Sequence, residues 1–168
     1  MSETRRRIAD HVEANPGVHF SELVRALDLA PGQVQYHLRK LDDRVVSAEL
    51  FGRTHYYPPD CDERDRRVLA ILRRETARDV VVSILRHGPS APGTVAEELG
   101  IARSTLEWHL DRLVDEDVVR KSRDQRGRVT LVLAAPDRTM EYLETVDPSL
   151  PERLVDRFDR LLDDLLPE

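Results

Sequence analysis

The sequence predicts a mainly α-helical protein of the α+β class, with two similar domains in tandem that each end in a small β-hairpin, and with further helices at the C-terminus. Three observations predict this fold. The chain repeats itself at a fixed interval, and each copy shows three amphipathic helical segments before a pair of short strand-like segments. A length of 168 residues with 40% hydrophobic content fits one or two domains that can each bury a core.

The repeat becomes visible when the chain is compared with itself at an offset of 72 residues. Seven identities then fall within residues 23–46, where chance would give about one or two. The identical residues are Leu27, Ala30, His37, Leu38, Leu41, Asp43 and Val46, which recur as Leu99, Ala102, His109, Leu110, Leu113, Asp115 and Val118. Because such a repeat is too long for a solenoid unit, the sequence predicts two copies of one small domain.

The first copy is predicted to contain three helices, over residues 4–15, 21–27 and 31–42. Ser21 is suited to cap the second helix, and Pro31 to open the third. A tight turn at residues 28–31 joins these two helices. A β-hairpin is expected to follow, with strands over 45–50 and 54–57 and a turn at 51–53.

The second copy is predicted to repeat this order, with helices near 79–87, over 94–99 and over 104–116. Ser104 is the expected N-cap of its third helix. Its hairpin is expected over 118–122 and 128–134, with a turn at 124–127. A helix, a helix-turn-helix and a hairpin form a winged helix, so the fold predicted is two winged-helix domains in tandem.

The third helices carry a more specific resemblance. Residues 104–113, Ser-Thr-Leu-Glu-Trp-His-Leu-Asp-Arg-Leu, resemble the recognition helix of ArsR- and MarR-like winged-helix regulators, and residues 33–41 are similar. Over about residues 4–135 the chain resembles the tandem winged helix-turn-helix transcriptional regulators of haloarchaea. This resemblance implies a DNA-binding transcriptional regulator.

Two departures from that family are visible. The family usually has a glycine between the third helix and the wing, where Val45 and Asp117 stand in this chain. Because valine disfavours positive φ, the third helix of the first copy is expected to end in another way. The Cys-x-Cys site of metal-sensing ArsR proteins is absent, so metal sensing is not implied.

The predicted domains are an N-terminal winged helix over 1–59, a helical linker over 60–78, a second winged helix over 79–135 and acidic, amphipathic C-terminal helices over 136–168. The linker follows Pro58-Pro59 and is expected to form one charged helix over 62–78, with an apolar stripe that includes Val68 and Leu72. The single cysteine, Cys61, excludes an internal disulfide and lies between two aspartates that blunt its reactivity.

The composition predicts a soluble cytoplasmic protein without a membrane partner. No apolar stretch approaches the roughly 18 residues of a membrane span, and the basic N-terminus lacks the apolar region of a secretory signal. The net charge of −6 arises in residues 136–168, which carry ten acidic and four basic side chains, so the remaining chain is compatible with DNA. The 24 Arg, 2 Lys and excess of Asp over Glu favour a halophilic archaeal source.

The sequence lacks a phosphate loop, a nucleophile–base motif and a constellation of metal ligands. Its six histidines show no close pair at ligand spacing. We therefore predict neither an enzyme nor a cofactor or metal site.

The third helix of the first copy is expected to present a basic, amide-rich face to DNA. At 100° per residue, Val34, Leu38 and Leu41 face the core. The opposite face carries Gln33, Gln35, Tyr36, Arg39 and Lys40 without an acidic residue. Arginine and lysine can contact phosphates or guanine, and glutamine can read adenine, so these five residues are predicted to bind DNA.

The third helix of the second copy has a different outward face, with Trp108 at its centre and two acidic side chains beside it. Trp108 is expected either to insert against DNA or a partner, or to pack on the other domain. The DNA-binding residues predicted on this helix are Arg103, Ser104, Thr105, Trp108 and Arg112. Because Glu107 and Asp111 would repel phosphates, the first copy is expected to dominate DNA affinity.

The two hairpin wings are expected to contact the phosphate backbone of double-stranded DNA. The predicted residues are Arg53 and His55 on wing one, and Arg123, Arg126 and Arg128 on wing two. The alternative is that these charges only keep the hairpins soluble.

The C-terminal segment is predicted to form a helix over 137–145, a break at 147–151 and a final amphipathic helix. The apolar side of that last helix would hold a homodimer together through Leu154, Val155, Phe158, Leu161, Leu162 and Leu165. Packing of the same face on its own chain is the alternative.

Together these features predict a sequence-specific DNA-binding transcriptional regulator, with recognition helices in the major groove and wings on the backbone. The alternative is a tandem winged-helix protein-interaction module, as in chromosome-condensation accessory subunits or membrane-remodelling complexes. The acidic second recognition helix and Trp108 suit that alternative, whereas the basic first recognition helix suits DNA.

Overall fold

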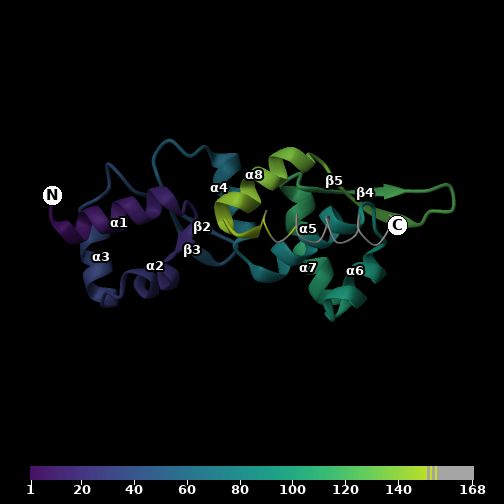
Figure 1. Ribbon diagram of the computed structural model, residues 1–168, viewed down its shortest axis with the longest axis horizontal. Helices are drawn as coiled ribbons and strands as arrows, with labels where there is room; N and C mark the ends of the chain where they lie inside the picture. Colours follow the sequence, from purple (N-terminus) through teal and green to yellow (C-terminus); the bar gives the residue numbers. More distant parts are fainter. Residues whose placement is uncertain (151, 153, 155–168) are drawn as a thin grey trace, which may run out of the picture. The chain divides into compact units, whose positions relative to one another are not determined.

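The computed structural model describes residues 1–150 together with 152 and 154, and the chain divides into two compact units, residues 1–74 and 75–168 (Figure 1). Both units are mainly helical and each contains an antiparallel β-hairpin, which confirms the predicted α+β fold class and the repeat. The finer boundaries at residues 59, 78 and 135 stay predictions.

The first unit contains α1 (Glu3–Ala14), β1 (Val18–His19), α2 (Phe20–Leu27), α3 (Pro31–Arg39), β2 (Val46–Leu50), β3 (Arg53–Tyr57) and α4 (Glu63–Leu72). Its three strands form an antiparallel sheet in the order β1-β3-β2. Side chains of the first three helices, together with Leu41 just after α3, bury a common core that includes Ile8, Val12, Leu23 and Val34. This core fixes the inner side of α3 and leaves its outer side to solvent.

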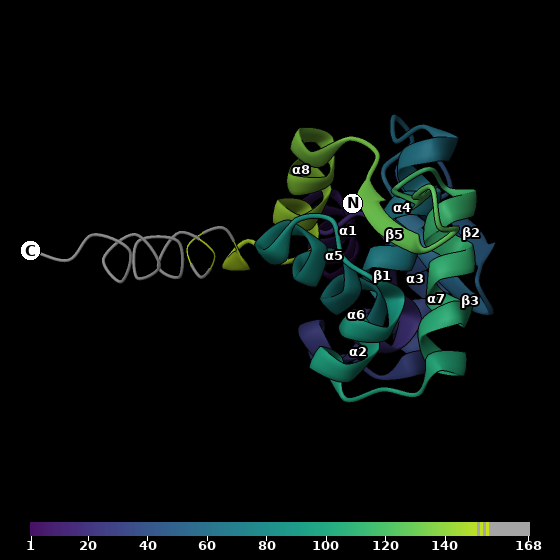
Figure 2. The ribbon, with the colours of Figure 1, turned by 90° about the vertical axis from the view of Figure 1, so that its right-hand side faces the viewer.

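The second unit contains α5 (Glu75–His87), α6 (Pro92–Leu99), α7 (Arg103–Asp115), β4 (Val119–Arg123), β5 (Val129–Leu133) and α8 (Pro136–Val146). Figure 2 shows α6 and α7 joined by their short turn. β4 and β5 form a two-stranded hairpin, and Ser90 bridges to Leu131 on β5. Leu106, Leu110 and Leu113 are fully buried on the inner side of α7.

Two of the predicted caps are wrong. The N-cap of α2 is His19 and that of α7 is Ala102, so Ser21 and Ser104 lie inside their helices. In α2 the start is displaced because Val18 and His19 pair with β3, a short strand that the sequence did not predict. Pro31 opens α3 as predicted.

The predicted linker helix over 62–78 is two helices. α4 ends at Leu72 and α5 begins at Glu75, and Arg73 and Arg74 form the break. Both arginines are tied to the first unit, since Arg73 donates to the carbonyl of Pro16 and Arg74 donates to that of Phe51. These contacts anchor the break between α4 and α5 to the first unit.

The third helix of the first copy ends without a left-handed residue at Val45, as expected. Asp117 has a φ of 57°, whereas Val45 is not among the residues with positive φ. In the first copy α3 ends at Arg39, three residues earlier than predicted, and Lys40 at its C-cap keeps a φ of −90°. The first copy therefore leaves its third helix without the left-handed residue that the second copy uses.

No helix within the described part of the chain is long and apolar enough to cross a membrane.

Candidate nucleic-acid interface

The outer face of α3 is exposed as predicted. Val34 is fully buried, while Gln33, Gln35, Tyr36, Arg39 and Lys40 are all exposed. Tyr36 is 53% exposed, a high value for an aromatic side chain, and the ammonium of Lys40 lies 5.8 Å from its ring centre. The carboxamide of Gln33 accepts a hydrogen bond from the Ala30 N–H at 3.3 Å, so this glutamine also helps to start the helix.

Gln35 and Arg39 differ from their neighbours because neither side chain has a hydrogen-bond, ion-pair or ring-contact partner within the part of the chain that the structure describes. They lie four residues apart, hence on the same side of α3. Both side chains border an open hollow of about 350 Å³. Its other lining residues are Leu38, Asp42, Val45, Ser47 and Tyr56. This edge of α3 can therefore offer two unsatisfied polar side chains to a partner.

The outer face of α7 is arranged differently. Trp108 is 37% exposed, and the guanidinium of Arg112 lies 3.9 Å from the centre of its ring. Arg112 also donates to the Trp108 carbonyl at 2.9 Å. The predicted contact residue Arg112 is thus folded back along the helix over the indole.

Glu107 ties α7 to the wing. One of its carboxylate oxygens lies 3.5 Å from Arg103 one turn earlier, and the other lies 3.2 Å from the ammonium of Lys121 on β4. Asp111, one turn further along, is exposed and has no partner among the described residues. Ser104 and Thr105 are exposed at the start of α7.

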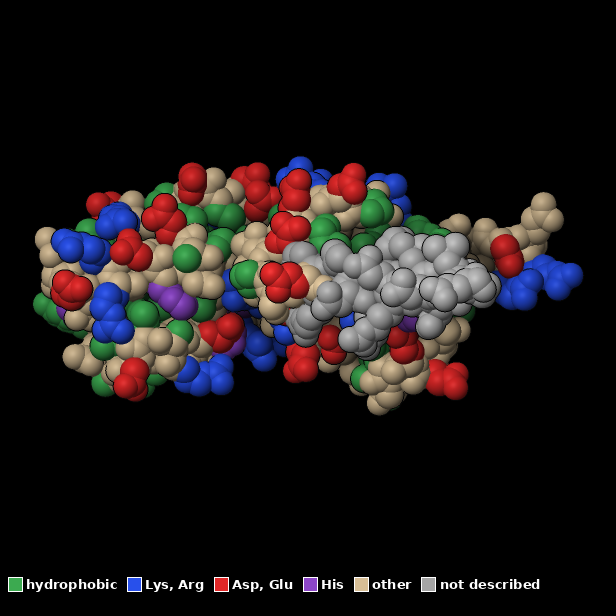
Figure 3. Space-filling view, viewed as in Figure 1, with side chains coloured by type: hydrophobic (Ala, Val, Ile, Leu, Met, Phe, Trp, Pro, Cys, Tyr) green, Lys and Arg blue, Asp and Glu red, His purple; other side chains and the backbone are tan. Residues whose placement is uncertain are grey.

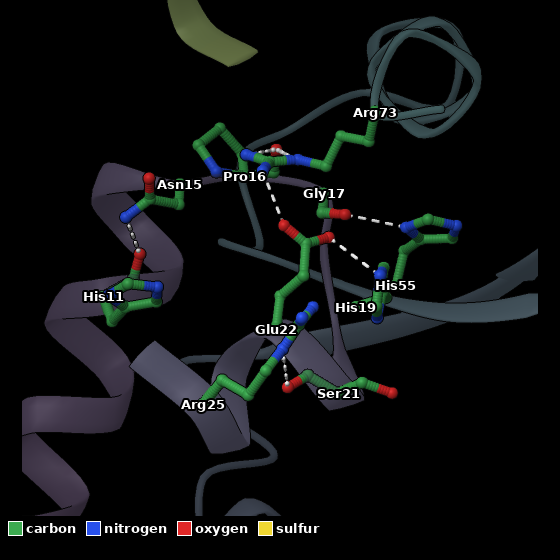
Figure 4. Close-up of polar contacts among 10 residues, drawn as sticks. All are labelled: His11, Asn15, Pro16, Gly17, His19, Ser21, Glu22, Arg25, His55 and Arg73. Atoms are coloured by element: carbon green, nitrogen blue, oxygen red, sulfur yellow. Dashed lines mark hydrogen bonds and ion pairs between the residues drawn. The ribbon is translucent and has the colours of Figure 1, made fainter. Parts of the chain in front are cut away.

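The prediction for wing one is half wrong. Arg53 is exposed, but His55 is only 1% exposed and its Nδ1 lies 2.7 Å from the carbonyl oxygen of Gly17 (Figure 4). Because side chains alternate along a strand, His55 lies on the same face of β3 as the buried Tyr57. His55 therefore supports the sheet and cannot contact a phosphate from this position.

A polar cluster surrounds the turn before α2 (Figure 4). Arg73 donates two hydrogen bonds to the Pro16 carbonyl, at 3.1 and 3.3 Å, and lies 3.7 Å from Glu22. Glu22 in turn lies 3.0 Å from His19. Gly17 has a φ of +91°, and a Cβ there would come within 3.3 Å of the Arg73 side chain. This close approach and the left-handed backbone together favour glycine.

Burial lowers the pKa of His55, an effect that the hydrogen bond to the Gly17 carbonyl only partly opposes. Burial also lowers the pKa of His19, against the opposing charge of Glu22. Burial and then the charge of Arg73 lower the pKa of His11, with Glu22 again opposing. All three imidazoles are therefore held neutral in the folded state at pH values where free histidine, with a pKa near 6.5, takes up a proton.

This cluster predicts a loss of stability in mild acid. Because the unfolded chain binds more protons than the folded one below about pH 6.5, the free energy of unfolding of the first unit is expected to fall as the pH drops from 6.5 toward the lower folded-state pKa values. His55→Gln removes one of these groups and should flatten the dependence. Denaturant unfolding between pH 5 and 7.5 checks this, and equal slopes for the variant and the parent would contradict it.

Wing two presents three exposed arginines on an ordered turn. Arg123, Arg126 and Arg128 lie at the tip of the β4–β5 hairpin, where Figure 3 shows basic side chains at the right-hand end. One carboxylate oxygen of Asp124 accepts from the backbone N–H groups of Arg126 and Arg128, both at 2.9 Å, and the other pairs with the Arg128 guanidinium at 3.1 Å. Arg123 donates to the Gly127 carbonyl at 3.2 Å.

The structural roles of Asp124, Glu107, Lys121 and Arg73 were missed in the sequence. The Asp124-x-Arg126 spacing is a readable signal for a turn in which an aspartate caps its own backbone. The pairing of Glu107 with Arg103 at i, i+4 is also readable. Nothing local predicts that Lys121 reaches Glu107 or that Arg73 reaches Pro16, because both contacts join distant segments.

The predicted dimerisation face falls almost wholly outside the described residues. Leu154 is half-buried, whereas Val155, Phe158, Leu161, Leu162 and Leu165 lie beyond them. Within the described residues, no group of three or more potential metal ligands occurs.

Comparison with known proteins matches both units to helix-turn-helix families. Residues 2–69 match a family model described as an N-terminal HTH domain, and residues 62–120 match one described as winged helix-turn-helix DNA-binding. An uncharacterized HTH-type transcriptional regulator of Methanocaldococcus jannaschii is 30% identical over 131 residues, which make up 77% of this chain and 33% of that protein. The chain thus spans about a third of the length of this relative.

Two solved structures that this chain partly resembles are those of transcriptional regulators. One, from Thermotoga maritima, is 25% identical with a TM-score of 0.42, over 62% of this chain and 71% of that one. The other, a MarR family regulator from Silicibacter pomeroyi, is 19% identical with a TM-score of 0.36, over 56% and 73%. The two family models, the sequence repeat and the two helix-turn-helix units with hairpins agree, and this chain is a tandem winged helix-turn-helix protein.

Proposed function

We propose that this protein is a sequence-specific DNA-binding transcriptional regulator rather than an enzyme. The observation that carries the proposal is the outer face of α3, where Gln35 and Arg39 are exposed without partners among the described residues, beside Tyr36 and Lys40. These residues occupy the recognition helix of a winged helix-turn-helix domain. The archaeal relative described as an HTH-type transcriptional regulator supports the same role.

In this proposal α3 enters the major groove. Gln35 can bond to the edge of adenine and Arg39 to guanine, and each such bidentate contact discriminates by about 1–3 kcal/mol against the wrong base. Lys40 and Gln33 are placed to contact the flanking backbone. The phosphates are contacted by arginines of the two wings, namely Arg53 on wing one and Arg123, Arg126 and Arg128 on wing two. At the start of α7 the phosphate contacts come from Arg103 and from the hydroxyl groups of Ser104 and Thr105.

The test is to capture fragmented genomic DNA with the purified protein in high KCl and to sequence the bound fragments. Enrichment of a few promoter sites that share a motif is the expected result. The paired variant Gln35→Ala, Arg39→Ala should lose this enrichment while keeping its thermal unfolding transition, because both side chains are exposed. Recovery of DNA without a motif, or of none from folded protein, would contradict a sequence-specific regulator.

A regulator of this kind would act on DNA in the cytoplasm, and we propose that it does so as a homodimer. The apolar face predicted over 154–165 supplies the dimer contact in this proposal, and a two-fold dimer would read a palindromic site. Deleting residues 151–168 should convert the dimer to a monomer in light scattering. A dimer that survives the deletion would contradict this assignment.

A protein-interaction module is the second candidate, and the face of α7 favours it. Trp108 is 37% exposed, a feature typical of binding surfaces, and the adjacent Asp111 carboxylate would repel phosphate. Under this second function the genomic capture recovers no DNA, and Trp108→Ala abolishes binding of a protein partner.

A further inference from the structure

The two recognition helices carry opposite chemistry at equivalent positions. At the repeat offset of 72 residues, Gln35 of α3 corresponds to Glu107 of α7, and Arg39 corresponds to Asp111. On α3 this pair has no partner among the described residues and borders an open hollow. On α7 the amide and the cation are replaced by two carboxylates, which cannot donate a hydrogen bond to a base, and the Asp111 carboxylate repels phosphates.

The remaining polar groups on the outer face of α7 are largely engaged within the second unit. Glu107 holds Arg103 through one oxygen and Lys121 of β4 through the other. Arg112 is stacked on Trp108 and bonded to its carbonyl. To reach a base edge, these side chains would have to break contacts, whereas Gln35 and Arg39 of α3 have none to break among the described residues.

The link between Glu107 and Lys121 joins α7 to the hairpin that displays the wing arginines. Lys121 lies on β4, whose last residue is Arg123, and the ion pair lies at the surface, with side chains that are 35% and 39% exposed. At its far end the hairpin is ordered by Asp124. The ion pair and the ordered turn thus connect α7 with the arginine-bearing tip of wing two.

We propose that the two winged helices divide the work on DNA, with α3 discriminating bases and α7 serving as a support that holds wing two against the backbone and reads no bases. This inference rests on the proposed function. It turns the expectation that the first domain dominates affinity into a more specific statement, which is that the first domain holds the base preference.

The deciding experiment is selection of bound sequences from a random DNA library. The first variant, Gln35→Glu with Arg39→Asp, copies the acids of α7 onto α3 and should abolish the selected motif. Its counterpart, Glu107→Gln with Asp111→Asn, removes two negative charges from α7 and should leave every motif position unchanged. Trp108→Ala should likewise keep the motif. A change in preferred bases with either α7 variant would overturn the proposal.

A second measurement tests the ion pair between Glu107 and Lys121 in the absence of DNA. Glu107→Gln and Lys121→Gln should lower the thermal stability of the second unit by less in combination than the sum of their separate effects, since each breaks the same ion pair. Asp111→Asn is the matched control and should add to Lys121→Gln independently. Additive effects for Glu107 and Lys121 would overturn the supporting role of α7.

The two measurements separate failure of this inference from failure of the proposed function. If the parent protein selects no DNA at all, the proposed function and the division of work both fail. If it selects a motif that α7 variants alter, the regulator stands and only the division of work fails.

Discussion

Replacing Arg73 with alanine is expected to lower the free energy of unfolding of the first unit by about 2–3 kcal/mol. The side chain is only 7% exposed, donates two hydrogen bonds to the Pro16 carbonyl and lies 3.7 Å from Glu22. Its removal would leave the Pro16 carbonyl and the partly buried Glu22 without this cation, and would open space against Gly17. Losses of this size are typical when a charged hydrogen-bond donor is deleted from a buried site.

Hydrogen exchange in the 168-residue chain measures this effect where it arises. Slowly exchanging amides around Val12 and Leu23 in the first core should exchange faster in Arg73→Ala, while those around Leu110 in the second unit keep their rates. Arg64→Ala is the matched control, because Arg64 lies exposed on α4, the helix that Arg73 follows, and should change stability by less than about 0.5 kcal/mol. Equal effects of the two substitutions would show that Arg73 has no special structural role.

The Arg73 contact illustrates which parts of the fold the sequence could predict. Helical periodicity located α1, α2, α3 and α7 to within a few residues, because their buried faces recur every three or four positions. The break between α4 and α5 has no such local signal. It depends on Arg73 and Arg74 reaching carbonyls more than twenty residues away. β1 was missed for the same reason, since its two residues become a strand only by pairing with β3.

The site was predictable to a similar degree. The outward face of α3 followed from helical geometry and is exposed as expected. His55 was misplaced although the signal was present, because strand alternation puts it on the side of the buried Tyr57. The neutralisation of Glu107 by Lys121 could not be predicted, since it requires knowing how the hairpin folds back on α7. Charge counts along a helix therefore overstate repulsion when a distant cation is the partner.

Replacing Arg123, Arg126 and Arg128 together with glutamine is expected to weaken DNA binding about a hundredfold at low salt, equally for all sequences. The three guanidinium groups are exposed at the tip of wing two and would each neutralise about one phosphate. Each contact that is lost reduces the slope of log affinity against log salt by about 0.9, so the variant should show a slope shallower by about 2–3. Titrations of labelled duplex at several KCl concentrations measure both quantities. An unchanged slope would place the phosphate contacts elsewhere.

Two substitutions of Asp124 distinguish the effect of the charge of wing two on DNA binding from the effect of its turn geometry. If only charge mattered, removing this carboxylate would tighten DNA binding whatever replaced it. Asp124→Asn keeps an oxygen that can accept from the N–H groups of Arg126 and Arg128, so we expect this variant to bind at least as tightly as the parent. Asp124→Ala also removes one negative charge but leaves both N–H groups without their acceptor, and the freed turn must be ordered again on binding. We therefore expect the alanine variant to bind several-fold more weakly than the asparagine variant, and tighter binding by both would show that the arginines act without a fixed turn.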